Sequence, residues 1–311
     1  MPYDSIVCVK QVPDTANVTA EAMKEDGTVN RAALPAIFNP EDLHALETAL
    51  EVRDLHGGTI TAVSMGPPKA ADVLRDCLYR GADRAILITD RRAAASDTLA
   101  TSYILSQAVR TIGRYDFVFC GRQAIDGDTA QVGPQCAEKL GLPQVTYLEK
   151  LVELRDRTAR IRRNVGNGWE LVEVRLPVLV TVLDSAAEPR PPAARRVMKY
   201  KRAVVRAELE AAVKAEYEKC GNGLKPVPQS QRDEEVERRA EHLRCRGLML
   251  EQWGLDDVGA DLSWCGLAGS PTKVHRVQAI VLTKQGYTEI PATEEGVRRL
   301  VRELVVDHTL G

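Results

Sequence analysis

Residues 121–135 read GRQAIDGDTAQVGPQ and lie between a short apolar run, 117–120, and a stretch with helical character that begins near Ala130. In a parallel α/β sheet, such a strand–loop–helix junction lies at the carboxyl end of a strand, where backbone N–H groups and the positive end of a helix dipole face an open crevice. Asp128 or Thr129 is expected to cap the helix. The stretch matches neither the Walker A nor the GxGxxG pattern. It therefore predicts a site for a phosphate-bearing ligand that is neither a P-loop nor a Rossmann fingerprint.

The chain on the amino-terminal side of this stretch alternates β-rich runs with helical patterns of roughly 10–15 residues. Asn39 and Pro40 mark one helix start, where Asn39 is expected to cap and Pro40 fits the first turn. We predict strands at 5–9, 59–65, 84–89 and 116–120, and helices at about 40–55, 69–80 and 97–112. This order predicts an α/β fold with a doubly wound parallel sheet.

The pattern changes after residue 143. Runs at 144–154, 158–164 and 170–176 alternate polar and apolar residues, which predicts an antiparallel β-meander, and the apolar run 177–183 predicts a buried strand that returns to the sheet. The Pro-rich, basic segment 187–202 is interpreted as a solvated loop or linker, with a docking loop for a partner protein as the alternative.

Three regions follow from this pattern: an α/β domain at 1–204, a charged helical insertion at 205–250 and a C-terminal arm at 251–311. The arm holds a strand candidate at 277–283 and an amphipathic helix at 293–306. We interpret the charged helices of the insertion as a solvated face, with a binding site for an extra subunit as the alternative.

Composition indicates a globular protein with a substantial core, because 44% of the 311 residues are hydrophobic. The 42 Lys and Arg residues nearly balance the 44 Asp and Glu residues, so no overall field favours nucleic acid. No apolar run approaches the roughly 20 residues of a membrane span, and we expect a cytoplasmic protein. The seven cysteines form no CxxC motif and are interpreted as free, mostly buried thiols.

Two acids in the opening stretch, Asp126 and Asp128, suggest a metal or acid–base role, but acids beside Gly and Thr in such a loop more often order the loop. The five histidines are dispersed, and no Ser-His-Asp or Cys-His arrangement can be assembled. The residues thus indicate a nucleotide pocket without a catalytic constellation. Its walls are predicted to be the loop after Val9, the loop after Ser64, residues 121–135 and the helix start at Asn39.

Several separated motifs resemble the beta subunit of electron-transfer flavoproteins. They are CVKQVPD at 8–14, NP at 39–40, SMGP at 64–67, RGADR at 80–84, residues 121–135, LPVLVTV at 176–182, EPR at 188–190 and MK at 198–199. The resemblance covers residues 1 to about 205 in order and, more weakly, about 251–311.

The resemblance implies a heterodimer with an alpha subunit that carries an electron-transferring FAD, against which the C-terminal arm would pack. It also implies an adenine nucleotide in the crevice of this chain, either AMP or a second FAD. Electrons would pass between a dehydrogenase or NADH and a downstream acceptor, and any NADH oxidation would require the alpha subunit. Carried over by position, the cofactor contacts are Cys8, Asn39, Pro40, Glu41, Asp42, Met65, Gly121, Arg122, Gln123, Ala124, Ile125, Asp126, Gly127, Asp128, Thr129, Ala130, Gln131 and Val132.

The sequence of the loop resembles the branch of the family that binds FAD and permits electron bifurcation, because Gly127, Thr129 and Gly133 would leave room for a pyrophosphate and a flavin. A structural AMP is the alternative, and a nucleotide-binding regulatory module similar to universal stress proteins is a second one. One departure concerns docking: Ala194 stands where the family's docking loop commonly carries Leu, which reduces the apolar area available to a dehydrogenase.

Overall fold

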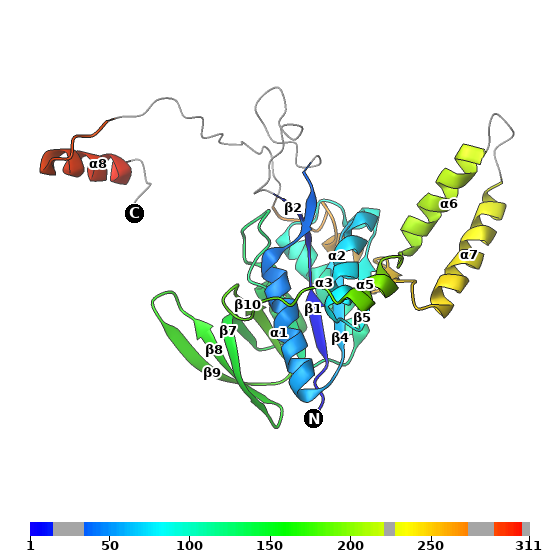
Figure 1. Ribbon diagram of the computed structural model, residues 1–311, viewed down its shortest axis with the longest axis horizontal. Helices are drawn as coiled ribbons and strands as arrows, with labels where there is room; N and C mark the ends of the chain where they lie inside the picture. The colour runs from blue at the N-terminus through cyan, green and yellow to red at the C-terminus, as the bar shows by residue number, and fades with distance from the viewer. Residues whose placement is uncertain (15–33, 221–227, 273–288, 307–311) are drawn as a thin grey trace.

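The computed structural model describes residues 1–14, 34–220, 228–272 and 289–306. Its centre is a nine-stranded sheet in the order β11-β5-β4-β1-β6-β10-β7-β8-β9 (Figure 1). The strands are β1 Ser5–Cys8, β4 Ile60–Met65, β5 Arg84–Ile88, β6 Phe117–Gly121, β7 Gln144–Arg155, β8 Thr158–Asn164, β9 Trp169–Arg175, β10 Val178–Val182 and β11 Glu251–Trp253. Two further strands, β2 Gln11–Pro13 and β3 Ala36–Phe38, form a small antiparallel sheet.

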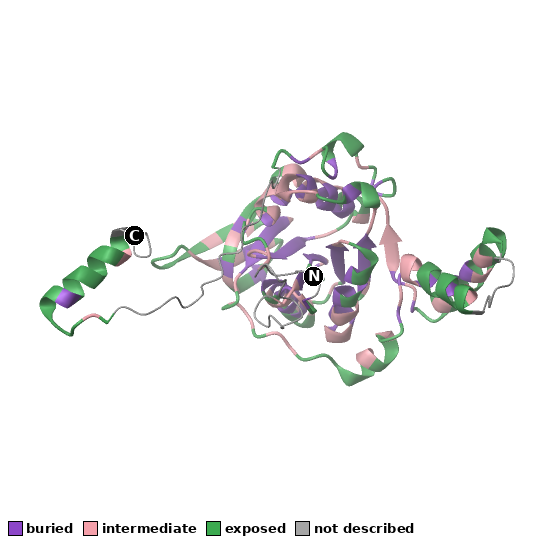
Figure 2. Cartoon of the chain, turned by 90° about the horizontal axis from the view of Figure 1, so that it is seen from above, coloured by how far each residue is buried: buried purple, intermediate pink, exposed green. Residues whose placement is uncertain are grey.

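Helices cover both faces of the sheet, which confirms the predicted α/β fold. On one face lie α1 Pro40–His56 and α2 Ala71–Arg80, and on the other lie α3 Thr98–Ile112 and α4 Val132–Leu140. Side chains of a strand point alternately to the two faces, so Phe117 and Phe119 join the first core while Val118 and Cys120 join the second. Figure 2 shows these buried residues concentrated on the strands and on the inner sides of the helices.

The strands β1, β4, β5, β6, β10 and β11 pair in parallel, and the predicted meander is confirmed as the antiparallel extension β7-β8-β9. β10 returns between β6 and β7, and all five of its residues are buried, as the apolar run predicted. The carboxyl ends of β1, β4, β5 and β6 therefore lie along one edge of the sheet.

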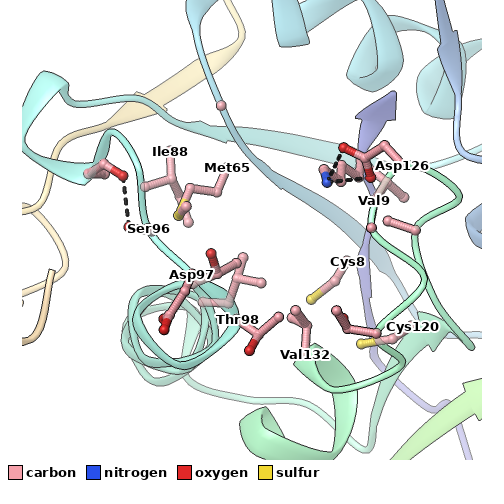
Figure 3. A pocket seen from close by; sticks show the side chains of 18 of the residues that line it. Cys8, Val9, Met65, Ile88, Ser96, Asp97, Thr98, Cys120, Asp126 and Val132 are labelled. Carbon is pink, nitrogen blue, oxygen red and sulfur yellow. Dashed lines mark hydrogen bonds and ion pairs between the residues drawn. The ribbon is translucent and has the colours of Figure 1, made fainter. Parts of the chain in front are cut away.

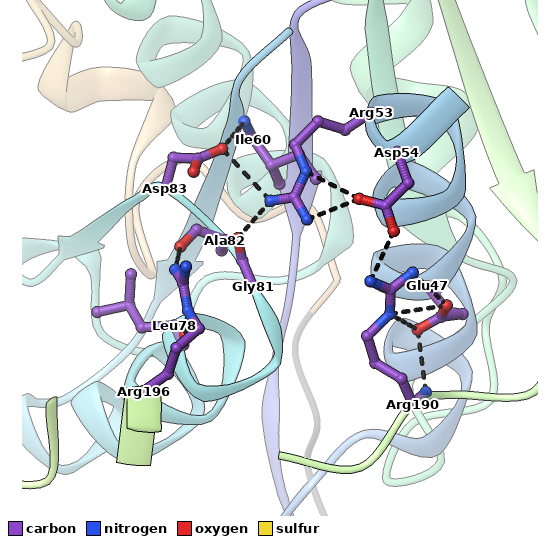
Figure 4. A network of polar contacts seen from close by, with 10 residues as sticks. All are labelled: Glu47, Arg53, Asp54, Ile60, Leu78, Gly81, Ala82, Asp83, Arg190 and Arg196. Atoms are coloured by element: carbon purple, nitrogen blue, oxygen red, sulfur yellow. Dashed lines mark hydrogen bonds and ion pairs between the residues drawn. The ribbon is translucent and has the colours of Figure 1, made fainter. Parts of the chain in front are cut away.

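The basic segment after β10 is fastened to the outer side of α1 and α2 and ends in a short helix, α5 Ala194–Tyr200. Arg190 pairs with Glu47 at 2.8 Å and with Asp54 at 2.8 Å, while Arg196 donates to the carbonyl groups of Leu78 and Ala82 at the end of α2 (Figure 4). The segment is thus held in place by its arginines. Its helix leaves Met198 66% exposed.

The predicted charged insertion forms a helical hairpin of α6 Arg206–Cys220 and α7 Gln229–Cys245. Its small core holds Leu209 and Val213 of α6 against Val236 and Ala240 of α7. Val204 and Leu250 close the root of the hairpin, because the Val204 N–H donates to Leu248 and the Leu250 N–H donates to Val204.

Residues 251–272 lie on the α/β domain itself, since β11 pairs with β5 and Leu255, Val258 and Cys265 join the core beside α3. The predicted terminal helix is present as α8 Glu294–Val306, which Figure 1 shows apart from the α/β domain. The strand candidate at 277–283 lies outside the described residues. Within the described ranges, the helices are all too short or too polar to span a bilayer. The free thiols include Cys8, Cys77, Cys120, Cys136, Cys245 and Cys265.

Candidate functional site

A cavity of about 740 Å³ opens at the carboxyl edge of the sheet (Figure 3). The loops predicted from topology meet there: the exit of β1, the exit of β4 and the loop between β6 and α4. Its volume lies within the about 300–1,000 Å³ that cofactor and small-molecule sites usually occupy. Of the predicted contacts, the cavity is lined by Cys8, Asp42, Met65, Gly121, Arg122, Gln123, Ala124, Asp126, Gly127, Thr129, Ala130, Gln131 and Val132.

The segment between β6 and α4, residues 122–131, follows directly from the buried strand Phe117–Gly121. Gly127 and Asp128 donate their N–H groups to the carbonyl of Ala124, which makes a tight turn. Asp128 and Ala130 have φ angles of 47° and 51°, in the left-handed region that L-residues rarely adopt. The backbone of this loop is therefore held in a definite shape along one wall of the cavity.

The helix that follows the loop begins without a side-chain cap. The N-cap residue of α4 is Gln131, whose side chain makes no capping hydrogen bond, so the expectation that Asp128 or Thr129 caps this helix is wrong. The neighbouring helix α3 is capped by Asp97, which accepts from the N–H groups of Leu99 and Ala100 at 2.9 and 3.0 Å. The first turn of α4 offers the N–H groups of Val132 and Gly133, since Pro134 has none, and because neither receives a side-chain cap, they can bind an anionic group in the cavity.

The two acids of the loop contact protein groups. Asp126 accepts from the ammonium of Lys10 at 2.7 Å, and Asp128 accepts from the side-chain amide of Gln123 at 2.9 Å. Within the described ranges, His, Cys, Asp and Glu side chains nowhere gather in threes as a metal site would require. These contacts agree with the interpretation of both acids as groups that order the loop.

The first turn of α1 lies directly behind the loop. The Asn39 side chain contacts the backbone of Gln123 and Ile125, Glu41 accepts from the Gln123 N–H, and Asp42 accepts from the N–H groups of Lys10 and Gly121 at 2.8 and 3.1 Å. Asn39 makes no capping bond to its own helix, contrary to the prediction. Five predicted contacts lie outside the cavity lining: Asn39, Pro40, Glu41, Ile125 and Asp128.

Asp42 is the most perturbed carboxyl group at this site. Burial raises its pKa from 3.8 to about 7, although the hydrogen bonds from Asn39, Lys10 and Gly121 oppose the shift. A carboxyl group with this pKa changes charge near neutral pH, at a position that borders the cavity.

Thiols form part of the cavity floor. Cys8 and Cys120 are register partners on β1 and β6, and both line the cavity. The contact with the Cys8 thiol and burial raise the pKa of Cys120 well above its usual range, and burial does the same to Cys136 in α4. These two groups are therefore neutral thiols at physiological pH, which agrees with the interpretation of the cysteines as packing residues.

The far wall of the cavity was missed by sequence reasoning. It consists of Ile88 at the end of β5, of Thr89 and Asp90 directly after it, and of most residues from Arg91 to Thr98, where α3 begins. Figure 3 shows Met65 and Ile88 across the cavity from Cys120 and Val132. A signal was available, because residues 90–97 follow the predicted strand 84–89 and so belong to the same edge of the sheet.

Two glycines in the loop region are required by close packing. A Cβ at Gly121 would lie 2.5 Å from the Asp42 carboxylate and 2.7 Å from the Glu41 backbone, and a Cβ at Gly133 would lie 2.7 Å from the Thr181 methyl group. Gly133 thus makes room for β10, whereas a Cβ at Gly127 would meet open space. Of the glycines expected to leave room for a ligand, Gly127 is the one whose open side agrees with that role.

Comparison with known proteins identifies relatives along most of the chain. Residues 26–212 match the model of the electron transfer flavoprotein domain. The chain is 38% identical to an electron transfer flavoprotein subunit beta of Clostridium acetobutylicum, over 97% of this chain and 98% of that protein. It is 39% identical to the protein FixA of Sinorhizobium fredii, over 96% of this chain and 91% of that protein. It is also 49% identical to the acryloyl-CoA reductase electron transfer subunit gamma of Anaerotignum propionicum, over 59% of this chain and 69% of that protein.

Proposed function

The chain belongs to the electron transfer flavoprotein family, among its beta subunits and FixA proteins, and from this premise we propose that its cavity binds FAD and that it relays electrons together with an alpha subunit. Electrons would pass between a dehydrogenase or NADH and a downstream acceptor, and a second flavin would permit bifurcation. Family membership argues against a stand-alone regulatory module similar to universal stress proteins.

The volume of the cavity and the spread of its lining residues support the choice of FAD over AMP. One end is formed by the 122–131 loop and the uncapped start of α4, which suit the phosphates of an adenylate. The cavity continues past this end to Met65, Ile88 and the start of α3, and AMP would leave that part empty. A dinucleotide that places its adenylate at α4 and its flavin between these walls would use the whole volume.

Residues of this chain would bind and shield the cofactor. The N–H groups at the start of α4 would meet the phosphates, and Met65 and Ile88 would pack against the ring at the far wall. FAD would supply the electron-accepting chemistry, which protein side chains lack. The thiol of Cys120 at the floor stays protonated and would exclude water from beneath the cofactor.

A direct count of cofactors tests the proposal. The heterodimer is denatured, and released FAD and AMP are separated and quantified per heterodimer. We expect two FAD molecules and no AMP. One FAD with one AMP would overturn the FAD assignment in favour of a structural AMP.

Substitution of Met65, which lies beside Ile88 of the far wall, separates the two ligands in a second way. Met65→Trp narrows the part of the cavity that only FAD would reach, and Gly127→Trp, its matched control, obstructs the adenylate end. If FAD is bound, both variants should lose this cofactor, by about tenfold or more in affinity for an overpacked site. Undiminished nucleotide content in Met65→Trp alone would indicate AMP.

The alpha subunit is the partner proposed for α8. Val297, Val301 and Val305 are 54%, 47% and 51% exposed and lie four residues apart on one face of this helix. The β-meander also leaves Trp169 62% exposed. Helix faces of this kind are usually buried in an interface, and a heterodimer would bury both surfaces.

Removal of the apolar face of α8 should weaken the heterodimer without unfolding the chain. Full burial of one valine contributes about 1.5–3 kcal/mol, so Val297→Ser with Val301→Ser should weaken association with the alpha subunit by about tenfold or more. Arg298→Ser with Arg302→Ser, on the same helix, is the control and should leave association nearly unchanged. Calorimetric titration of the two subunits measures the difference, and equal affinities in both variants would contradict the role of this face.

A further inference from the structure

Several hydrogen bonds of the backbone of residues 121–125 are made by side chains at the start of α1. The Asn39 amide donates to the Gln123 carbonyl at 2.8 Å and accepts from the Ile125 N–H at 3.1 Å, so a single side chain holds both a carbonyl and an N–H of the loop. Asn39 is fully buried. Asn at an N-cap usually stabilises its own helix by about 1 kcal/mol, and α1 goes without this bond. The side chain is thus committed to the loop instead of its helix.

Glu41 also holds the loop, at Arg122 and Gln123. Its carboxylate accepts from the Gln123 N–H at 3.0 Å and from the guanidinium of Arg122 at 2.7 Å, and the group is 8% exposed. Both oxygens of this carboxylate are therefore engaged by the loop. Charge-assisted hydrogen bonds in such a buried setting are roughly twice as strong as neutral ones.

Neither side chain borders the cavity, whereas Arg122 and Gln123, two of the residues that they hold, do. Arg122, Gln123 and Ala124 line the wall where the adenylate end of the ligand is proposed to lie, and Asn39 and Glu41 are behind them. Gly121 allows this arrangement, because a side chain there would collide with the first turn of α1. The shape of the wall is thus imposed from outside the loop.

We propose that Asn39 and Glu41 are positioning residues that set the shape of the 121–125 wall and thereby determine how tightly the cavity holds an adenine nucleotide, which they do not touch. This inference rests on the proposed function in that it takes the ligand to be FAD or AMP. It assigns Asn39 and Glu41 a role different from the direct contact that the family resemblance implies.

Two variants test the inference, each with a feature that separates positioning from stability. Asn39→Ser removes both contacts with the loop and leaves a part-buried carbonyl and a part-buried N–H without these partners, while the serine offers α1 an N-cap that offsets part of this loss of stability. Nucleotide affinity should therefore fall by more than in a control variant of similar stability. Glu41→Gln keeps one acceptor for Gln123 but turns an NH₂ group toward the guanidinium of Arg122. We expect each variant to bind FAD and AMP about 10- to 100-fold more weakly, as calorimetric titration of the nucleotide-free full chain would measure.

The chain offers a matched control on the same helix. Glu47 is 6% exposed and, like Glu41, accepts one backbone N–H and one guanidinium, in this case from Arg190 (Figure 4). Glu47→Gln should lower the thermal midpoint by the same amount as Glu41→Gln and change nucleotide affinity less than about twofold. Equal losses of affinity in Glu41→Gln and Glu47→Gln, or unchanged affinity in Asn39→Ser, would overturn the inference.

Amide hydrogen exchange gives a readout that does not depend on the ligand. The Ile125 amide should exchange faster in Asn39→Ser, which removes its acceptor, and the Gln123 amide should exchange faster in Glu41→Gln, where a neutral amide oxygen replaces the carboxylate; the amides of β6 should stay protected in both. If the wild-type chain binds neither FAD nor AMP, the proposed function fails, and exchange then decides the inference by itself. Unchanged protection of both amides would refute the positioning role.

Discussion

Replacing Asp42 with alanine is expected to lower the free energy of unfolding by about 1–5 kcal/mol, because the buried N–H of Gly121 and the part-buried N–H of Lys10 lose their acceptor and an unsatisfied buried group costs about 1–3 kcal/mol. Asp42 joins the exit of β1 to the end of β6, since Lys10 and Gly121 donate to its two oxygens. The loss would be a large fraction of the about 5–15 kcal/mol that stabilises a typical protein. Urea denaturation of the purified chain measures it, and nucleotide binding should be lost as well.

The control for this substitution is Glu51→Ala on the exposed side of α1. It removes a carboxyl group from the same helix and should change stability by no more than about 0.5 kcal/mol. Asp42→Asn should not restore the wild-type stability, because the NH₂ group of asparagine would face one of the two N–H donors. A similar stability in Asp42→Ala and Glu51→Ala would show that the base of the cavity does not depend on this carboxyl group.

The raised pKa of Asp42 predicts that the chain loses stability as the pH rises from about 4 to about 7. In the unfolded chain this carboxyl group ionises near 3.8, whereas in the folded chain burial holds the proton until about pH 7. The folded state therefore binds more protons across this window, and its stability falls with rising pH. The shift corresponds to about 4 kcal/mol, with the loss complete above pH 7.

Stability curves of the wild type and of Asp42→Asn isolate this effect. The difference between their free energies of unfolding should change steadily from pH 4.5 to pH 7.5, with the wild type losing relative to the variant. Asp90 does not interfere, because its hydrogen bonds with Arg92 lower its pKa to about 2 and its titration falls below this window. Parallel curves would mean that Asp42 is already ionised at the lower pH.

The parallel sheet was predictable because each of its central strands is a short apolar run that ends at residues which stop regular structure. Chain order then places the exits of β1, β4 and β6 at one edge, and the cavity does lie there. The same reasoning covers the exit of β5, and applying it to residues 90–97 would have found the far wall. Local patterns were thus sufficient for the fold and for most of the cavity wall.

The partners of individual side chains were not predictable from local sequence. Asn39 and Asp128 both have the chemistry of a helix cap, but each finds a partner elsewhere that the fold brings close: Asn39 on the loop backbone, and Asp128 on the Gln123 side chain. Gly133 resembles a ligand-binding glycine, and only the position of Thr181 on β10 reveals that it serves packing. These contacts depend on distant segments, which sequence spacing does not specify.

The closed root of the α6–α7 hairpin makes this segment modular. Two hydrogen bonds between Val204 and the chain at Leu248 and Leu250 hold its two ends together, and the chain then continues into β11 at the edge of the sheet. These ends meet regardless of what lies between them. Removing turns from the far end of both helices would therefore leave the register of β11 unchanged, and so would inserting a folded domain there. The hairpin is therefore a natural place to attach a fluorophore or an affinity domain, at a distance from the cavity.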